Sequence, residues 1–139
     1  MRKFMLFLLT LCLALPALAE RKETFGDLDV HYSVFNSSFL QPDIAAASGL
    51  VRSKTQAVVS VSVLKHGKPL NTAVDGSVKN LLGQLSPLAF KQINGQGAIY
   101  YLAQFQMEQR EMLTFTLKVK NSDGSNNSFT FNQEVFPDE

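Results

Sequence analysis

The chain has 139 residues, with 13 basic and 12 acidic side chains, two histidines and a single cysteine. This balance of charge leaves no electrostatic footprint for nucleic acid, and no run of cations is long enough to hold an anionic membrane surface. About 120 residues after the leader described next are enough for one packed core and too few for two domains.

The first 19 residues, MRKFMLFLLTLCLALPALA, have a basic start, an apolar run and a small-x-small end, which predicts a cleavable signal peptide. The apolar run, about 12 residues, is too short for a membrane-spanning helix, which needs roughly 20. Cleavage removes Cys12 and two cations, which leaves 11 basic against 12 acidic residues. We therefore expect an exported protein with a single domain over residues 20–139, no disulfide and no stable membrane anchor.

Alternation of apolar and polar residues predicts short strands with one buried face along most of this domain. The runs are LDVHYSVF (28–35), VVSVSVLK (58–65), a weaker one at 73–82 interrupted by Gly76, SPLAFKQI (86–93), AIYYLAQFQM (98–107), MLTFTLKVK (112–120) and SFTFNQEVF (128–136). Turns are expected at KHGKP (65–69) and Asn94-Gly95, Gly76 is expected to mark a bulge or a close backbone approach, and the last two runs are expected to form a hairpin.

These runs give about seven strands, and the connections between them are too short to hold crossover helices. The sequence therefore predicts an all-β fold, an antiparallel β-sandwich of the immunoglobulin or fibronectin type, with a small closed barrel as the competing architecture. The stretch FNSSFLQPDIAAASGLVRSK, residues 35–54, breaks the alternation. Pro42, Asp43 and Gly49 there are typical of a helix start, first turn and stop, so we expect a short helix between the first two strands.

Residues 35–54 also carry a candidate binding surface. Arg52 and Lys54 project the same way if the chain is extended, and with Asn36 and Phe39 they could frame a shallow polar pocket for a small anion or a peptide carboxylate. The alternative is that apolar residues of this stretch close one end of the sandwich, namely Phe39, Leu40, Ile44 and Leu50. Tyr100 joins the candidate surface, because Tyr100 and its neighbour Tyr101 must point to opposite faces of a strand, and an outward aromatic ring can anchor a partner or a sugar.

Catalytic and metal-binding patterns are sparse. His31 has Asp29 two residues away on the same strand face, which is compatible with a hydrolase-like dyad and equally with an ordinary exposed strand. Met107 and Met112 with a distant histidine could hold a soft copper ion, although Met107 falls on the apolar face of its predicted strand, which favours core packing. We assign no catalytic residue, no metal ligand and no cofactor.

Several separated motifs resemble a family of small exported proteins of Gram-negative bacteria known as domain of unknown function 4426. They are GDLDVHYSVFNSSFLQPDIAAASGLVRSK (26–54), NLLGQ (80–84), GAIYYLAQF (97–105) and FTFNQEVF (129–136). The resemblance implies a periplasmic β-sandwich and no particular activity. Together with the residues, it predicts a non-enzymatic periplasmic protein that binds a protein partner or a small polar ligand. A copper carrier or a hydrolase-like enzyme using His31 and Asp29, and a structural envelope component, remain the alternatives.

Overall fold

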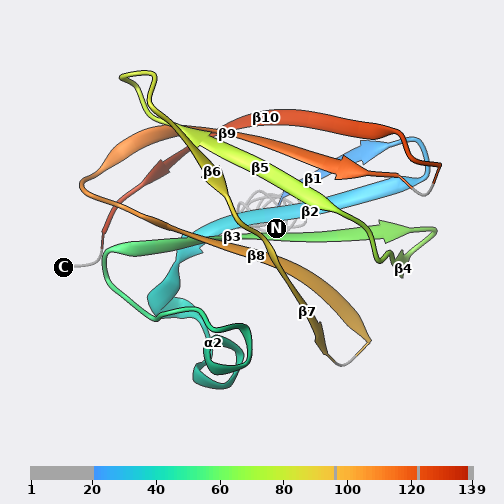
Figure 1. Ribbon diagram of the computed structural model, residues 1–139, viewed down its shortest axis with the longest axis horizontal. Helices are drawn as coiled ribbons and strands as arrows, with labels where there is room; N and C mark the ends of the chain where they lie inside the picture. The colour runs from blue at the N-terminus through green and yellow to red at the C-terminus, as the bar shows by residue number, and fades with distance from the viewer. Residues whose placement is uncertain (1–20, 96, 122, 138–139) are drawn as a thin grey trace, which may run out of the picture.

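The structure is a computed structural model that describes residues 21–95, 97–121 and 123–137, and these form two antiparallel sheets that face each other (Figure 1). The predicted signal peptide over residues 1–19 lies outside the described residues. The first sheet has the order β1 (Arg21–Phe25), β2 (Leu28–Asn36), β3 (Gln56–Lys65), β8 (Ala98–Gln106) and β7 (Lys91–Gly95), with β4 (Lys68–Pro69) paired to the end of β3. The second has the order β10 (Asn126–Val135), β9 (Glu111–Lys120), β5 (Val74–Lys79) and β6 (Leu85–Leu88).

The core between the sheets follows from the alternation in the sequence. In β9, every second residue from Leu113 to Val119 is buried, and Val59, Val61 and Val63 of β3 are fully buried opposite them. Aromatic rings fill the space between the sheets, with ring centroids 4.6 Å apart for Tyr32 and Phe131. Burial of this apolar surface is the main stabilising term of a fold without a disulfide.

The sandwich-like all-β fold is confirmed, while the predicted strand count and the position of the helix are wrong. The described residues contain ten strands rather than about seven, and the α-helix α2 (Pro42–Ser48) follows the second strand, between β2 and β3. Residues 21–25, which do not alternate cleanly, pair with β2 across a tight turn at Gly26 and form an additional first strand, which places the helix after the second strand. The other two extra strands are β4 and the one gained because residues 86–93 are divided between β6 and β7. The predicted hairpin of the last two runs is confirmed as the β9–β10 pair.

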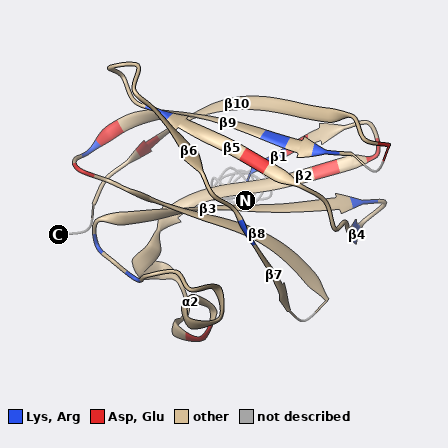
Figure 2. Ribbon diagram, viewed as in Figure 1, with Lys and Arg blue, Asp and Glu red and all other residues tan. Residues whose placement is uncertain are grey.

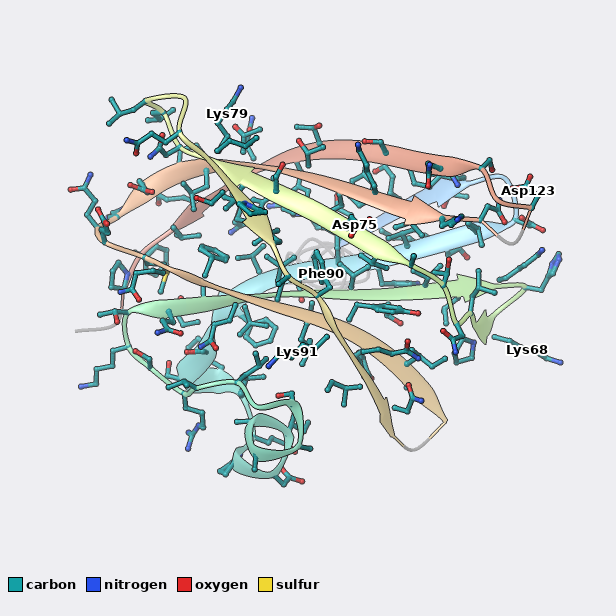
Figure 3. All side chains as sticks on the ribbon, viewed as in Figure 1. Lys68, Asp75, Lys79, Phe90, Lys91 and Asp123 are labelled. Atoms are coloured by element: carbon teal, nitrogen blue, oxygen red, sulfur yellow. The ribbon has the colours of Figure 1, made fainter. Side chains whose placement is uncertain are left out.

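The run at 86–93 is not one strand, because the chain changes sheet in its middle. β6 belongs to the second sheet and β7 to the first, and Phe90 lies between them at the crossover (Figure 3). The ring of Phe90 packs against the core beside Gly76 of β5. A Cβ on Gly76 would lie 2.9 Å from the carbonyl oxygen of Thr116 and 3.2 Å from the Phe90 ring, so the predicted close backbone approach is confirmed.

Candidate functional site

Residues 35–54, here called the insert, cover part of the outer face of the first sheet (Figure 1). A 3₁₀ turn, η1 (Ser37–Phe39), leads into α2, which has Pro42 in its first turn and Asp43 as its acidic first-turn residue. The helix ends at Gly49, whose left-handed backbone (φ 72°) lets Leu50 N–H donate to the Ala45 carbonyl. The short helix expected from the sequence is therefore confirmed, although it follows the second strand.

Hydrogen bonds close the insert on itself and attach it to the sheet. The hydroxyl of Ser37, which is fully buried, donates to the Ser53 carbonyl (3.0 Å) and accepts from the Ser53 amide (2.8 Å), closing the insert at its base. On β8, the Gln104 amide donates to the Val51 carbonyl (2.5 Å) and accepts from the Val51 N–H (3.1 Å). The first pair closes the base of the insert, and the second pair fixes the insert against β8.

Apolar packing completes the attachment. A second cluster of buried residues, separate from the main core, joins the insert to outward-facing positions of β3 and β8, namely Leu40, Ala45, Val58 and Leu102. Phe35, Leu50 and Ile93 pack against this cluster. The Lys91 ammonium lies beside the end of α2 (Figure 3), 3.3 Å from the position of a Cβ on Gly49, where a cation complements the negative end of a helix.

A cleft of about 590 Å³ remains between α2 and the sheet, and we call it the insert cleft. Its apolar lining consists of Phe35, Leu40, Ile44, Ala47, Ile93, Ala98, Tyr100 and Leu102. Its polar lining comes from Gln41, Asp43, Ser60 and Asn94, and Gly95 also lines it. Asp43 is the only charged side chain among these lining residues, and the ribbon of α2 includes an acidic segment (Figure 2). A mostly apolar concavity with a few polar groups is the usual composition of a ligand site.

A smaller cleft of about 280 Å³ continues along the same sheet face. It shares Ser60 and Tyr100 with the insert cleft and extends to His31, Ser62 and Leu64. Tyr100, which is 44% exposed, therefore stands between the two hollows. Its partner across the β7–β8 pairing is Ile93, which also lines the larger cleft.

The other candidate residues from the sequence do not line either cleft. The Asn36 amide donates to the Phe136 carbonyl (3.1 Å), and the Arg52 guanidinium donates to the Ser38 carbonyl (3.2 Å). Phe39 is 73% exposed, and Lys54 is also exposed. A binding role for these four residues stays a prediction, whereas Tyr100 lies within the hollowed surface.

The alternative reading of the insert as an end plug is only partly right. Leu40 is buried and Leu50 is partly buried, but Phe39 and Ile44 are exposed to 73% and 38%. The buried pair packs on the outer face of the sheet rather than on the end of the sandwich. The reason is that apolar residues occur at outward positions of the strands, and they create a second surface that the insert can cover.

Phe35, Ile93 and Leu102 are cleft residues that sequence reasoning missed. Each lies at a position where alternation calls for an outward polar side chain, and Leu102 pairs with Ser60 in the β3–β8 ladder. An apolar residue at an outward position indicates that something covers that face. This signal was present in the sequence, but it did not identify the covering segment.

The residues considered for catalysis and copper binding occupy separate surroundings. His31 lies on the outer sheet face opposite Ser62, while the Asp29 carboxylate accepts a hydrogen bond from the Thr24 hydroxyl (3.0 Å). Met107 is 1% exposed in the main core, and Met112 is 41% exposed at the start of β9.

The metal-binding and membrane-spanning features of the chain can be stated for the part that the structure describes. Within residues 21–95, 97–121 and 123–137, no three His, Cys, Asp or Glu side chains are grouped so that they could hold a metal ion. Among these same residues, no helix combines the length and the apolar composition needed to span a bilayer.

One carboxyl group has a clearly shifted pKa, and it lies away from the insert cleft. The Ser125 hydroxyl donates to Asp123 (2.6 Å), and the Ser125 backbone N–H donates to the same oxygen (2.8 Å). These bonds stabilise the carboxylate and lower the pKa of Asp123 below its ordinary value. The residue stands in the β9–β10 connection, at the other end of the molecule from Lys91 and α2 (Figure 3).

Solved structures with a similar fold include one close relative and two structures of FetP. A DUF4426 family protein from Pseudomonas aeruginosa PAO1 is 53% identical, with a TM-score of 0.84, and the match covers 89% of this chain and 100% of that one. FetP from uropathogenic Escherichia coli strain F11 is 9% identical, with a TM-score of 0.57 and coverage of 86% and 95%. A copper-bound variant of FetP is 10% identical, with a TM-score of 0.60 and coverage of 86% and 91%. The likeness to FetP shows the fold alone.

The family assignment rests on most of the sequence. A search of the curated proteins gave no match. The family model described as domain of unknown function (DUF4426) matches residues 22–138, which includes both sheets and the insert. The resemblance inferred from the separated motifs is confirmed, and the chain belongs to the DUF4426 family.

Proposed function

We propose that this protein is a non-enzymatic periplasmic binding protein of a Gram-negative bacterium, and that the insert cleft is its binding site. The observation that supports the proposal is the cleft itself, about 590 Å³ in volume and bordered by α2, with the insert closed at its base by the hydrogen bonds between Ser37 and Ser53. A site attached this firmly is largely formed before the ligand arrives, which reduces the entropic cost of binding.

The lining indicates the chemistry of the ligand. Phe35, Ile93 and Leu102 offer apolar surface to an apolar body, whose burial supplies the affinity. Asp43 brings a negative charge to the lining, and the ligand that fits best carries an amine or another hydrogen-bond donor there. This is a different ligand from the small anion expected of a pocket framed by Arg52 and Lys54.

Tyr100 gives the site a second recognition element. Its half-exposed ring stands between the two hollows, so it can stack on a planar group while its hydroxyl remains available to polar atoms. An elongated ligand could therefore extend from the insert cleft toward His31.

The geometry favours this proposal over the copper and hydrolase hypotheses. FetP has been solved as a copper-bound variant, but here Met107 is enclosed in the core and Met112 is exposed on another strand, so the two thioethers do not meet at a common accessible point. For hydrolysis, Asp29 would have to orient His31; its carboxylate accepts a hydrogen bond from the Thr24 hydroxyl, and Asp29 does not line the cleft next to His31.

The proposal is tested by filling the cleft. Ala47 of α2 lines the insert cleft, and its neighbour Ala46 is exposed without lining it. We expect Ala47→Phe to weaken binding of the apolar aromatic amine N-phenyl-1-naphthylamine at least about tenfold, while Ala46→Phe leaves binding unchanged. Dye fluorescence gives both dissociation constants, and equal affinities for the two variants would contradict the proposal.

A second variant separates the cleft from the surface inferred from the sequence. Arg52→Ala combined with Lys54→Ala leaves the cleft lining intact, so dye binding should match that of the wild type. Loss of dye binding in this variant, with binding by the Ala47→Phe protein unaffected, would indicate that the binding site is the surface around Arg52 and Lys54. A wild-type protein that binds no dye would favour the structural envelope role.

A further inference from the structure

The turn between β5 and β6 projects beyond the edge of the second sheet and carries unusually exposed leucines (Figure 1). Leu81, Leu82 and Leu85 are 79%, 85% and 66% exposed, and together we call them the leucine tip. Single exposed leucines are common on soluble proteins, but three within five residues at a projecting turn form a local apolar surface.

Asn80 holds this turn in a fixed shape. Its side-chain oxygen accepts the backbone N–H groups of Leu82 (3.0 Å) and Gln84 (2.9 Å), and its backbone carbonyl accepts that of Gly83 (3.0 Å). Its own N–H donates to the Gln84 carbonyl (3.1 Å), and its side-chain amide donates to the Gln84 side chain (2.7 Å). The leucines are therefore presented to solvent by a turn that satisfies most of its own backbone donors.

A turn with this bonding leaves water at a lower cost than an unbonded loop does. An irregular loop normally cannot enter an apolar medium, because each unpaired backbone group costs several kcal/mol there. In residues 80–84 the N–H groups of Asn80, Leu82, Gly83 and Gln84 are paired, which removes much of that penalty, and the leucine side chains form the apolar surface of the turn. We propose that the leucine tip inserts into the interfacial region of a lipid bilayer and brings the protein reversibly to a membrane surface.

The charges around the tip agree with shallow insertion. The chain has no Asp or Glu from Gly76 to Met107, and the charge nearest the tip in sequence is Lys79, whose long side chain points into solvent beside the turn (Figure 3) and can reach lipid head groups. Glu108 and Glu111 line a cleft of about 390 Å³ together with Asn80, at the base of the turn and not at its leucines. Two carboxylates and one lysine leave no net positive charge at the head-group level, so the insertion requires no anionic lipid.

Lipid fits the tip better than a protein pocket does. Residues that dominate protein interfaces are mostly Trp, Tyr and Arg, whereas Leu is under-represented among them. Residues 79–88, KNLLGQLSPL, contain none of those three residue types. A fluid bilayer, in contrast, accepts leucine without shape complementarity, and its affinity scales with the apolar area inserted.

The absence of tryptophan from the sequence makes a direct test possible. Leu82→Trp places a single fluorophore at the tip, and Phe39→Trp places one at a comparably exposed site, 73% against 85%, on the insert. With vesicles of phosphatidylcholine and phosphatidylethanolamine, we expect a blue shift and quenching by brominated phosphatidylcholine for the first variant only. No change in the first variant, or equal changes in both, would overturn the proposal.

Vesicle co-sedimentation provides the second measurement. Leu81→Ser combined with Leu82→Ser should lower the membrane partition coefficient by about tenfold or more, because the inserted apolar surface is lost. The thermal midpoint should not change, since both side chains are solvated in the folded protein. Binding should persist at high salt. Binding that disappears at high salt, or that is unchanged in the double variant, would contradict insertion by leucine and indicate an electrostatic or protein-mediated contact.

Discussion

Gly76 has no space for a side chain, which makes Gly76→Ala the sharpest test of the packing between the sheets. The new Cβ would lie 2.8 Å from the Leu117 side chain and 2.9 Å from the Thr116 carbonyl oxygen. The leucine can rotate, but the carbonyl belongs to the β9 backbone that pairs with β5, so the ladder itself must move. Phe90 limits movement on the crossover side, because its ring would be 3.2 Å from the same Cβ.

The expected cost follows from two opposing effects. Overpacking of this kind costs about 1–3 kcal/mol, while replacing glycine stabilises by about 0.4–1 kcal/mol because the unfolded chain loses freedom. We expect a net loss of roughly 1–2 kcal/mol in the free energy of unfolding, equivalent to a fall of roughly 4–8 °C in Tm for a domain of this size. Urea unfolding followed by circular dichroism measures the free energy directly.

Gly95→Ala is the matched control, since it is also a strand glycine and a Cβ there would meet no atom within 4 Å. Its stability should equal or slightly exceed that of the wild type. If Gly76→Ala unfolds at the same urea concentration as Gly95→Ala, then β9 and Phe90 move at little cost to admit the new Cβ, and the expected overpacking is refuted.

Other contacts give further predictions. Tyr101→Phe should cost about 1–3 kcal/mol in urea unfolding, because the buried hydroxyl accepts from the Thr72 N–H (2.8 Å) and its loss leaves that donor unpaired. Ser37→Ala should cost a similar amount, about 1–3 kcal/mol, and should speed amide exchange across the insert; unchanged exchange would show that apolar packing alone holds it. Ser125→Ala should raise the pKa of Asp123 toward its ordinary value in a carboxyl NMR titration. Because the folded-state pKa is lowered, the Asp123 contribution is present above the unfolded pKa and is lost as pH falls through the folded value, so the variant should lose less stability on acidification.

The strands were predictable because their signal is local. Burial alternates along β9 from Leu113 to Val119, with each buried side chain two residues from the next, so the sequence alone indicates that one face of the strand is buried. The helix of the insert was equally readable, since Pro42 and Gly49 mark its two ends within one short segment. The division of residues 86–93 could not be predicted, because it depends on which sheet each half joins and not on the local pattern.

For the candidate site as well, features that depend on neighbouring residues were predictable, and features that depend on distant segments were not. Tyr100 was identified because its outward phase depends only on its neighbours along β8, and it does line both hollows. Asn36 and Arg52 were grouped because they are close in sequence, but each makes its hydrogen bond to a different backbone segment. Ile93 and Asp43 belong to β7 and to the insert, and no local pattern links two such segments.

The sequence by itself determined the strand periodicity, the short helix and the family of this protein, since each depends on residues that are near one another in the chain or on motifs in a fixed order. The tertiary structure decided which sheet each strand joined and which outer face the insert covered. It also decided where a cleft remained. Those outcomes depend on contacts between distant segments, such as Gln104 with Val51 and the buried cluster that joins Leu102 to the insert, and no local rule of alternation or capping specifies them.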